Sequence, residues 1–164
     1  MGKSQRDKGK RGEREAAKVL TKALGVKFAR GVQHSGSPDS PDVKAAEPLG
    51  LHFEIKRDES TIANRVHEKL KKSRHPVIIH HDKYECSLAA IAVDMLDECD
   101  WNMPMLKGTM SLWKAMAQAI DDAGDGKIPV VMSRRNGGKW YLFVRLIDYG
   151  PFVEKVKEIK CSNN

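Results

Sequence analysis

Residues 51–57, LHFEIKR, constrain the fold more than any other segment of the chain. Side chains of a β-strand alternate between its two faces, so apolar residues at every second position predict one face against a core. Glu54 and Lys56 share the opposite face with His52. Charged groups in such a strand cost free energy unless they are solvated, paired or bound to an ion. The segment is therefore either an ordinary strand with an ion pair or part of a functional site. Its predicted apolar face consists of Leu51, Phe53 and Ile55.

Helical and strand patterns precede this segment. Residues 12–24, GEREAAKVLTKAL, have apolar side chains at helical spacing and end before Gly25, a typical helix stop. Short strands are expected at 26–30 and 42–45, joined by polar loops and turns. A helix followed by strands with short connections predicts an α/β domain with a central mixed sheet flanked by helices.

The second half of the chain repeats an order of elements. Residues 61–96 and 112–148 each show a helical run, a strand led by Pro-Val, a polar turn and a second apolar strand. Their identity is low, so the pattern is either a duplicated helix–hairpin unit or a coincidence. Residues 87–99 suit a strand or a helix, because their alanine-rich run also contains β-branched residues. A last helix is predicted at 151–160, started by Pro151.

Positive charge is clustered in a chain whose formal net charge is +7. Basic side chains gather at the N-terminus, in residues 69–74 and at Arg134 and Arg135. Such clusters favour a polyanionic partner, most simply nucleic acid. The polar, lysine-rich residues 1–10 are expected to form a flexible basic arm, and residues 11–164 a single domain.

Several classes of protein are disfavoured by the sequence. No apolar run approaches the length of a membrane span, and the basic N-terminus lacks the apolar stretch of a secretory signal. The three cysteines are scattered and contain no CxxC pair, which argues against a disulfide framework and suits a reducing cytoplasm. We therefore expect a cytoplasmic protein with no membrane partner.

Two glutamates of the predicted first helix are expected to differ in environment. Glu13 lies at helical spacing from the apolar residues of the helix, and so on its apolar face. Glu15, about 200° away around the helix axis, is expected to face solvent. A carboxylate on the apolar face suggests a functional role, although the helix dipole favours a glutamate in the first turn of any helix.

The strands at 42–45 and 51–56 would bring Asp42 and Glu54 together if they pair. Two carboxylates with a few waters suit Mg²⁺, and the backbone carbonyl of Ile55 could add a ligand. A bound metal ion would lower the pKa of a water molecule and neutralise charge on a phosphodiester.

Lys56 has two interpretations. It would hold an attacking hydroxide or stabilise the negative charge of a transition state if Glu54 binds a metal ion. The structural alternative is a Glu54–Lys56 pair on one strand face, with Asp42 capping a turn.

Asp39 also follows a proline, but only Asp42 leads into a predicted strand, which is the more rigid support for a metal ligand.

These residues resemble the PD-(D/E)XK nuclease signature. Pro41-Asp42 is followed, after an eleven-residue gap, by Glu54-Ile55-Lys56. The GERE helix is similar to the first helix of archaeal and phage Holliday-junction resolvases in this superfamily, where a glutamate at the position of Glu13 completes the metal site. The segment ARGVQHSGSPD resembles the loop of those enzymes before the Pro-Asp pair, with matches at Arg30 and Ser35.

The resemblance implies a restriction-endonuclease-like domain at 11–164 that hydrolyses DNA phosphodiester bonds with Mg²⁺, for which Mn²⁺ substitutes. It further implies branched DNA as the substrate, a homodimer that cuts two strands symmetrically, and the cytoplasm of a bacterium or a phage-infected host. Residues 60–108 depart from the simpler members, as an insertion or as the duplicated helix–hairpin unit.

Further residues are assigned by position. Residues 112–124 and 129–136 resemble the helix and basic hairpin of phage-type members, which implies a supporting role for Gln118. His67 or Asn64 is the alternative, because of the departure at 60–108. The basic side chains proposed to contact phosphate are Arg11, Arg30, Arg134 and Arg135; for the last two, a solvated hairpin tip is the alternative. Trp113 and Trp140 fall within apolar patterns and are expected in the core.

Two other functions are compatible with the sequence. One is a different PD-(D/E)XK nuclease, of the restriction, repair or exonuclease type. The other is a basic DNA-binding protein without catalysis, whose binding would be sensitive to salt and would yield no Mg²⁺-dependent product.

Overall fold

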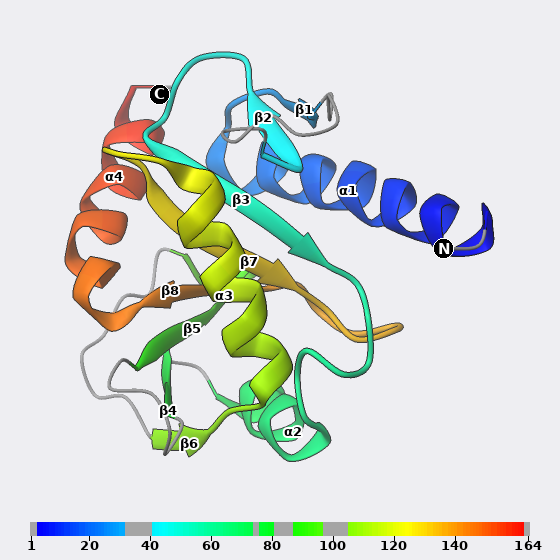
Figure 1. The fold of residues 1–164 in the computed structure, drawn as a ribbon. Coiled ribbons are helices and arrows are strands. Elements are labelled where there is room, and N and C mark those ends of the chain that lie inside the picture. The colour runs from blue at the N-terminus through cyan, green and yellow to red at the C-terminus, as the bar shows by residue number, and fades with distance from the viewer. Residues whose placement is uncertain (1–2, 32–40, 74–75, 81–86, 97–104, 163–164) are drawn as a thin grey trace.

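The computed structural model describes residues 3–31, 41–73, 76–80, 87–96 and 105–162 (Figure 1). Four α-helices and eight strands occupy these residues, together with two short 3₁₀ helices. The helices are α1 (Lys3–Leu24), α2 (Asn64–Lys72), α3 (Met110–Ala123) and α4 (Tyr149–Cys161), and the 3₁₀ helices are η1 (Val93–Met95) and η2 (Leu146–Asp148). The strands are β1 (Phe28–Arg30), β2 (Val43–Ala45), β3 (Leu51–Lys56), β4 (Val77–His80), β5 (Leu88–Ala92), β6 (Met105–Lys107), β7 (Ile128–Ser133) and β8 (Tyr141–Arg145).

All eight strands form one mixed sheet in the order β1-β2-β3-β7-β8-β5-β4-β6. β3 lies beside β7 in parallel and beside β2 in antiparallel orientation. A parallel pair requires a crossover, which residues 57–127 provide through α2, the distal strands and α3. The predicted class, a central mixed sheet flanked by helices, is confirmed, and it matches a restriction-endonuclease-like architecture.

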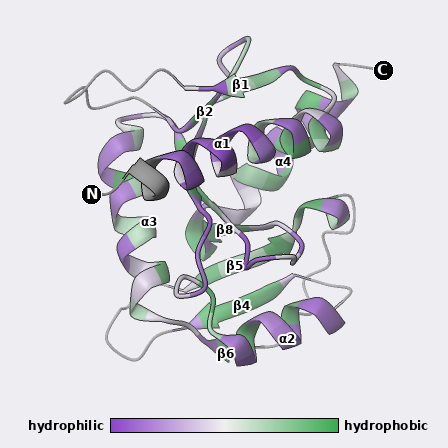
Figure 2. Ribbon diagram, turned by 90° about the vertical axis from the view of Figure 1, so that its right-hand side faces the viewer, coloured by the Kyte–Doolittle hydropathy of each residue, from purple (hydrophilic) through white to green (hydrophobic). Residues whose placement is uncertain are grey.

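Two apolar cores cover the two faces of the sheet, with α3 and α4 on opposite sides in Figure 2. The first core joins α1 and α4 to one face, and the second joins α2 and α3 to the other. The alternation predicted for β3 is confirmed, because its apolar face belongs to the first core. The opposite face is also covered, since α3 packs against β3 and β7, and Glu54 is buried there. Trp113 and Trp140 lie in the cores, as expected.

The first helix is longer than predicted. α1 begins at Lys3, whereas we expected residues 1–10 to form a flexible arm before a helix at 12–24. Lysine, arginine and glutamine are good helix formers, and one glycine, Gly9, is tolerated within a helix. The side chains of residues 7–11 are exposed. The basic N-terminal segment therefore extends from the domain as part of a helix.

The departure at 60–108 adds elements to one edge of the sheet. β5 pairs with β8, β4 pairs with β5, and β6 pairs with β4. The ambiguous residues 87–99 form a strand and then η1, with residues 97–99 outside the described part. The order helix, strand, strand, 3₁₀ helix thus occurs twice, as α2-β4-β5-η1 and α3-β7-β8-η2. This repeat fits a duplicated unit, which remains a hypothesis.

The start of β2 is held against the end of β1 by a close backbone contact. The N–H of Gly31 donates to the carbonyl of Asp42 at 2.8 Å. A Cβ atom on residue 31 would lie only 1.9 Å from the carbonyl oxygen of Pro41. Glycine is therefore required at this position, and the contact fixes where the Pro41-Asp42 pair enters the sheet.

We predict that Gly31→Ala lowers the free energy of unfolding by about 2 kcal/mol or more, because the backbone of Pro41 must move to admit the methyl group. Gly9→Ala is the matched control. A Cβ atom at residue 9 meets no atom closer than 4.0 Å, so alanine there should stabilise α1 by about 0.5–1 kcal/mol. Urea denaturation of the three proteins measures both effects, and equal stability of Gly31→Ala and the wild type would contradict the prediction.

Candidate active site

Two carboxylates meet where β2 begins beside the middle of β3. The antiparallel register pairs Val43 with Phe53, so the preceding residue, Asp42, lies beside Glu54. Asp42 is 8% exposed and Glu54 is 5% exposed. The Oδ2 atom of Asp42 accepts a hydrogen bond from the N–H of Ile55 at 2.8 Å. This bond directs the Asp42 carboxylate toward the centre of β3.

Glu54 is the most perturbed carboxyl group of the site. Its pKa is raised from 4.5 to about 7, mainly by burial and also by the negative charge of Asp42, while Lys56 lowers it. Asp122 on α3 contributes a smaller increase. Two adjacent buried carboxylates cannot both ionise easily without a cation. The pair is therefore a donor set that favours a positively charged ligand.

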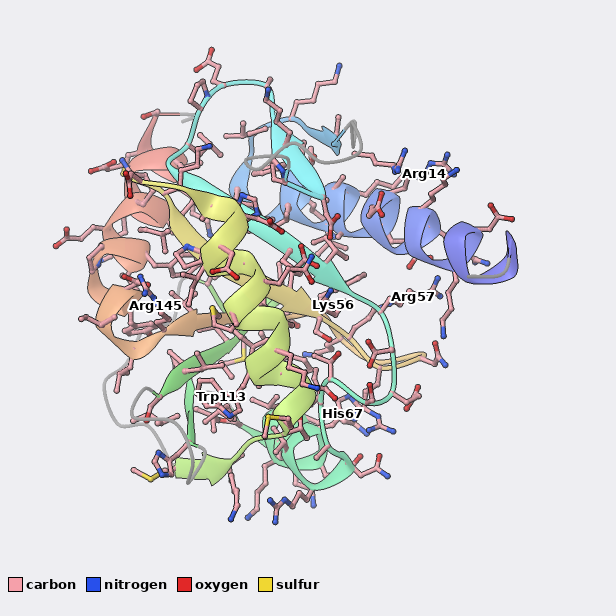
Figure 3. All side chains as sticks on the ribbon, viewed as in Figure 1. Arg14, Lys56, Arg57, His67, Trp113 and Arg145 are labelled. Carbon is pink, nitrogen blue, oxygen red and sulfur yellow. The ribbon has the colours of Figure 1, made fainter. Side chains whose placement is uncertain are left out.

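Lys56 supplies positive charge at this point. Its Nζ atom donates to Oε1 of Glu54 at 2.6 Å and to Oε1 of Gln118 at 3.0 Å. Figure 3 shows Lys56 at the carboxyl end of β3, close to α3. Because β3 and α3 are packed together, Gln118 reaches a residue that is distant from it in the sequence.

His67 lies elsewhere. It is buried on α2, where its ring stands edge-on to Tyr141 with the ring centroids 6.0 Å apart. A Cβ atom on Gly138 would lie 2.8 Å from its Nε2 atom, so the histidine faces the β7–β8 hairpin. Asn64 is exposed at the start of α2. Of the three candidates for the supporting role, the structure joins Gln118 by a direct hydrogen bond to Lys56.

Glu13 forms an ion pair with Arg30 of β1, and both side chains are largely buried. It does not join Asp42 and Glu54 in a cluster: among the described residues, no three His, Cys, Asp or Glu side chains gather closely enough to hold a metal ion. Glu13 as a metal ligand thus remains a prediction. The carbonyl of Ile55 as a metal ligand also remains a prediction, since Ile55 contacts Asp42 through its N–H.

Glu15 is only partly exposed, with 28% of its side chain accessible, whereas helical periodicity predicted a residue that faces solvent. Its carboxylate contacts three arginines: Arg134 at 2.7 Å, Arg11 at 3.3 Å and Arg57 at 3.7 Å. Helical periodicity correctly placed Glu15 away from the apolar face of α1, but the β7–β8 hairpin contacts the side of the helix that carries Glu15. The sequence indicates this contact only through charge, because Glu15 is acidic and Arg57 and Arg134, which are far away along the chain, are basic. The residues Glu15, Arg11, Arg57 and Arg134 are called the arginine cluster below.

The two hairpin arginines have structural partners in this structure. Arg134 pairs with Glu15, and its guanidinium lies 5.1 Å from the ring centroid of Trp140. Arg135 donates to the backbone carbonyls of Glu59 and Ile62, at 3.0 and 2.7 Å, and also pairs with the Glu59 carboxylate. Neither side chain is a solvated hairpin tip. Both attach the hairpin to neighbouring segments.

Ser35 and Asp39 lie outside the described residues, and the interpretations given to them stay predictions. None of the helices in the described part of the chain has the length and hydrophobicity needed to span a bilayer.

The fold and the site define a class of protein. A mixed sheet carries Glu54 and Lys56 on β3, and Asp42 immediately precedes the adjacent strand β2, in the order of the PD-(D/E)XK signature. The family described as "Phage putative PDDEXK endonuclease" matches residues 4–163, nearly the whole chain. The chain belongs to this family, and therefore to a class of nucleases that act on DNA. No curated protein and no solved structure matches the chain.

We predict that the stability of the metal-free wild type falls, relative to Glu54→Gln, as pH rises from 4.5 to about 7. In this range the folded protein keeps the Glu54 proton that the unfolded chain has already lost, so each step up in pH favours unfolding. Over the whole range the difference should reach the order of 3 kcal/mol. Urea denaturation at several pH values in a chelating buffer measures it, with the exposed Glu154→Gln as control. A difference that does not change with pH would contradict the prediction.

We predict that Glu15→Ala lowers the free energy of unfolding by about 1–2 kcal/mol, because two largely buried arginines lose their carboxylate partner. A double-mutant cycle with Arg134→Ala should give a coupling energy of at least about 0.5 kcal/mol. Glu154→Ala, an exposed change on α4, should be nearly neutral. Additive effects of the Glu15 and Arg134 substitutions would show that the arginine cluster contributes no direct stabilisation.

Proposed function

We propose that this protein is a Mg²⁺-dependent endonuclease that hydrolyses DNA phosphodiester bonds and prefers branched DNA. The observation that carries the proposal is the contact between two buried carboxylates and a lysine, in which Asp42 lies beside Glu54 and Lys56 donates to Glu54. The membership in a family of phage endonucleases supports the nuclease class. The choice of Mg²⁺ and of branched DNA goes further and needs its own test.

The donor set fits a hard divalent cation. Asp42 and Glu54 present carboxylate oxygens, and like-charge proximity together with burial makes a cation favourable between them. Asp42 and Glu54 would hold the ion, with the carbonyl of Ile55 and the carboxylate of Glu13 as proposed further ligands. A bound divalent ion supplies charge neutralisation at the phosphate and lowers the pKa of a coordinated water.

The residues of the chain have distinct roles in the proposed reaction. The N–H of Ile55 keeps the Asp42 carboxylate in place for binding. Lys56 places a positive charge where water attacks phosphorus and the bond to the leaving oxygen breaks, so that it stabilises the added negative charge of the transition state. Gln118 accepts a hydrogen bond from the same ammonium group and limits its orientations. Each of these groups is held by β3 or by an element packed against it.

The positively charged surface is proposed to bind the DNA backbone. Arg11 is the most exposed member of the arginine cluster, with 73% of its side chain accessible, and lies on the basic helix α1. All four arginines pair with carboxylates, but only 30%, 19% and 14% of the side chains of Arg30, Arg134 and Arg135 is accessible. Arg11 is therefore a stronger candidate than these three for a direct phosphate contact. A homodimer that cuts two strands of a junction is proposed from the resemblance to resolvases.

We predict that Asp42→Asn and Lys56→Ala each reduce the cleavage rate by at least about a hundredfold, because one removes a metal ligand and the other the charge that stabilises the transition state. The measurement is a gel assay with Mg²⁺ on a four-way junction and, separately, on a linear duplex of the same sequence. Both variants should remain folded and bind DNA with an affinity close to that of the wild type.

The same assay separates the alternatives. Cleavage of the junction well above cleavage of the duplex supports the branched substrate, whereas equal cleavage indicates another nuclease type. Salt-sensitive binding without any Mg²⁺-dependent product would indicate a DNA-binding protein without catalysis. Undiminished cleavage by either variant would overturn the assignment of the site. Lys157→Ala, an exposed change on α4, is the matched control for the loss of a lysine.

A further inference from the structure

α3 carries a second polar residue next to the candidate site. Asp122 is half-buried, one helical turn beyond Gln118, and the two side chains lie on the same side of the helix because their spacing is four residues. The helix is held in place around these residues, because Met116 and Ala119 of α3 are packed in the second core and Ala123 is buried. Asp122 therefore has a fixed position relative to β3.

A chain of contacts connects this residue to the candidate site. The Nζ atom of Lys56 donates to Oε1 of Glu54 at 2.6 Å and to Oε1 of Gln118 at 3.0 Å. The Nε2 atom of Gln118 donates in turn to Oδ2 of Asp122, at 3.5 Å. The order of groups is thus carboxylate, ammonium, amide, carboxylate, with donors and acceptors alternating throughout.

The orientation of the Gln118 amide decides whether this chain can exist. A glutamine side chain has an accepting oxygen on one side and a donating NH₂ group on the other. Lys56 can only donate, so it requires the oxygen of Gln118. An ionised aspartate can only accept, so Asp122 requires the NH₂ group. Both neighbours therefore select the same one of the two amide orientations.

We propose that Asp122 is a positioning residue, which holds the amide of Gln118 with its oxygen toward Lys56 and thereby keeps the Lys56 ammonium at Glu54. The proposal rests on the proposed nuclease function for its effect on cleavage. Without Asp122 the amide can turn over, and the NH₂ group would then face the ammonium of Lys56. Lys56 would lose one of its two acceptors and adopt more orientations, which slows a reaction that depends on its position.

The first test compares steady-state cleavage by four variants. Asp122→Ala should lower kcat about tenfold with little change in KM, since it removes the group that orients Gln118 and leaves DNA contacts in place. Asp122→Asn should recover most of the rate, because the asparagine oxygen can still accept from Gln118. Asp121→Ala is the matched control, an exposed aspartate next to it on the same helix, and should cleave like the wild type.

The fourth variant is a designed rescue. In Gln118→Glu/Asp122→Ala, a carboxylate at position 118 presents an acceptor to Lys56 in either orientation, and the total charge of the site stays the same. This double variant should cleave several-fold faster than Asp122→Ala. A residue that merely stabilised α3 would not be rescued in this way. If the folded double variant is no faster than Asp122→Ala, the proposal is overturned.

The second test is independent of nuclease activity. Nitrogen-15 NMR of the Lys56 ammonium group, in the protein without DNA or divalent ions, measures how rapidly its protons exchange with water. The signal should be protected in the wild type and in Asp121→Ala, lost in Asp122→Ala, and restored in the double variant. Unchanged protection in Asp122→Ala would overturn the proposal. If the wild type cleaves no DNA but its Lys56 signal follows this pattern, the proposed function fails and the positioning role stands.

Discussion

The hydrogen bond from the Ile55 amide to the Asp42 carboxylate is the contact on which the candidate site depends. It links Asp42, the residue just before β2, to Ile55 of β3, and it places one buried carboxylate beside another. Such a pair is unfavourable on its own, and the raised pKa of Glu54 expresses this cost. The surroundings supply compensation, through the ammonium of Lys56 and through a geometry that suits a divalent cation. Gly31, without a side chain, permits the backbone approach that holds Asp42 there.

The basic residues divide into two groups that composition alone does not distinguish. Arg30, Arg134 and Arg135 connect elements of the domain, because each is paired with a glutamate from another segment. Arg11 is mostly exposed, and α1 projects its basic N-terminal turns away from the sheet (Figure 1). A net charge of +7 is therefore not spread evenly over a DNA-binding surface. Arg134 and Arg135 instead hold the β7–β8 hairpin against α1 and against the segment that follows β3, close to Lys56.

Local patterns predicted the elements best where one face of an element is buried. The strand at 51–56, the helix before Gly25 and the hairpin of β7 and β8 follow from periodicity, and the structure confirms them. Residues 87–99, which suited a strand or a helix, begin with the strand β5. Helical periodicity also separated Glu13 from Glu15, but it was wrong about the surroundings of Glu15. A helical wheel shows which side of α1 is apolar and faces the core. It contains no information about contacts with the hairpin at residues 128–145, which is distant in the sequence. The extension of α1 to Lys3 was missed because polar residues give no periodic signal.

By itself the sequence determined the strand that carries Glu54 and Lys56, the Pro41-Asp42 entry, the class of fold and the nuclease signature, because each depends on residues close together in the chain. Only the tertiary structure decided that Gln118, and not His67, contacts Lys56, and that Gln118 in turn donates to Asp122. It also decided that Glu15 faces three arginines. The physical reason is the parallel pairing of β3 with β7. The chain must cross over to form this pair, and the crossover brings α3 and the hairpin, more than fifty residues away in sequence, against the end of β3.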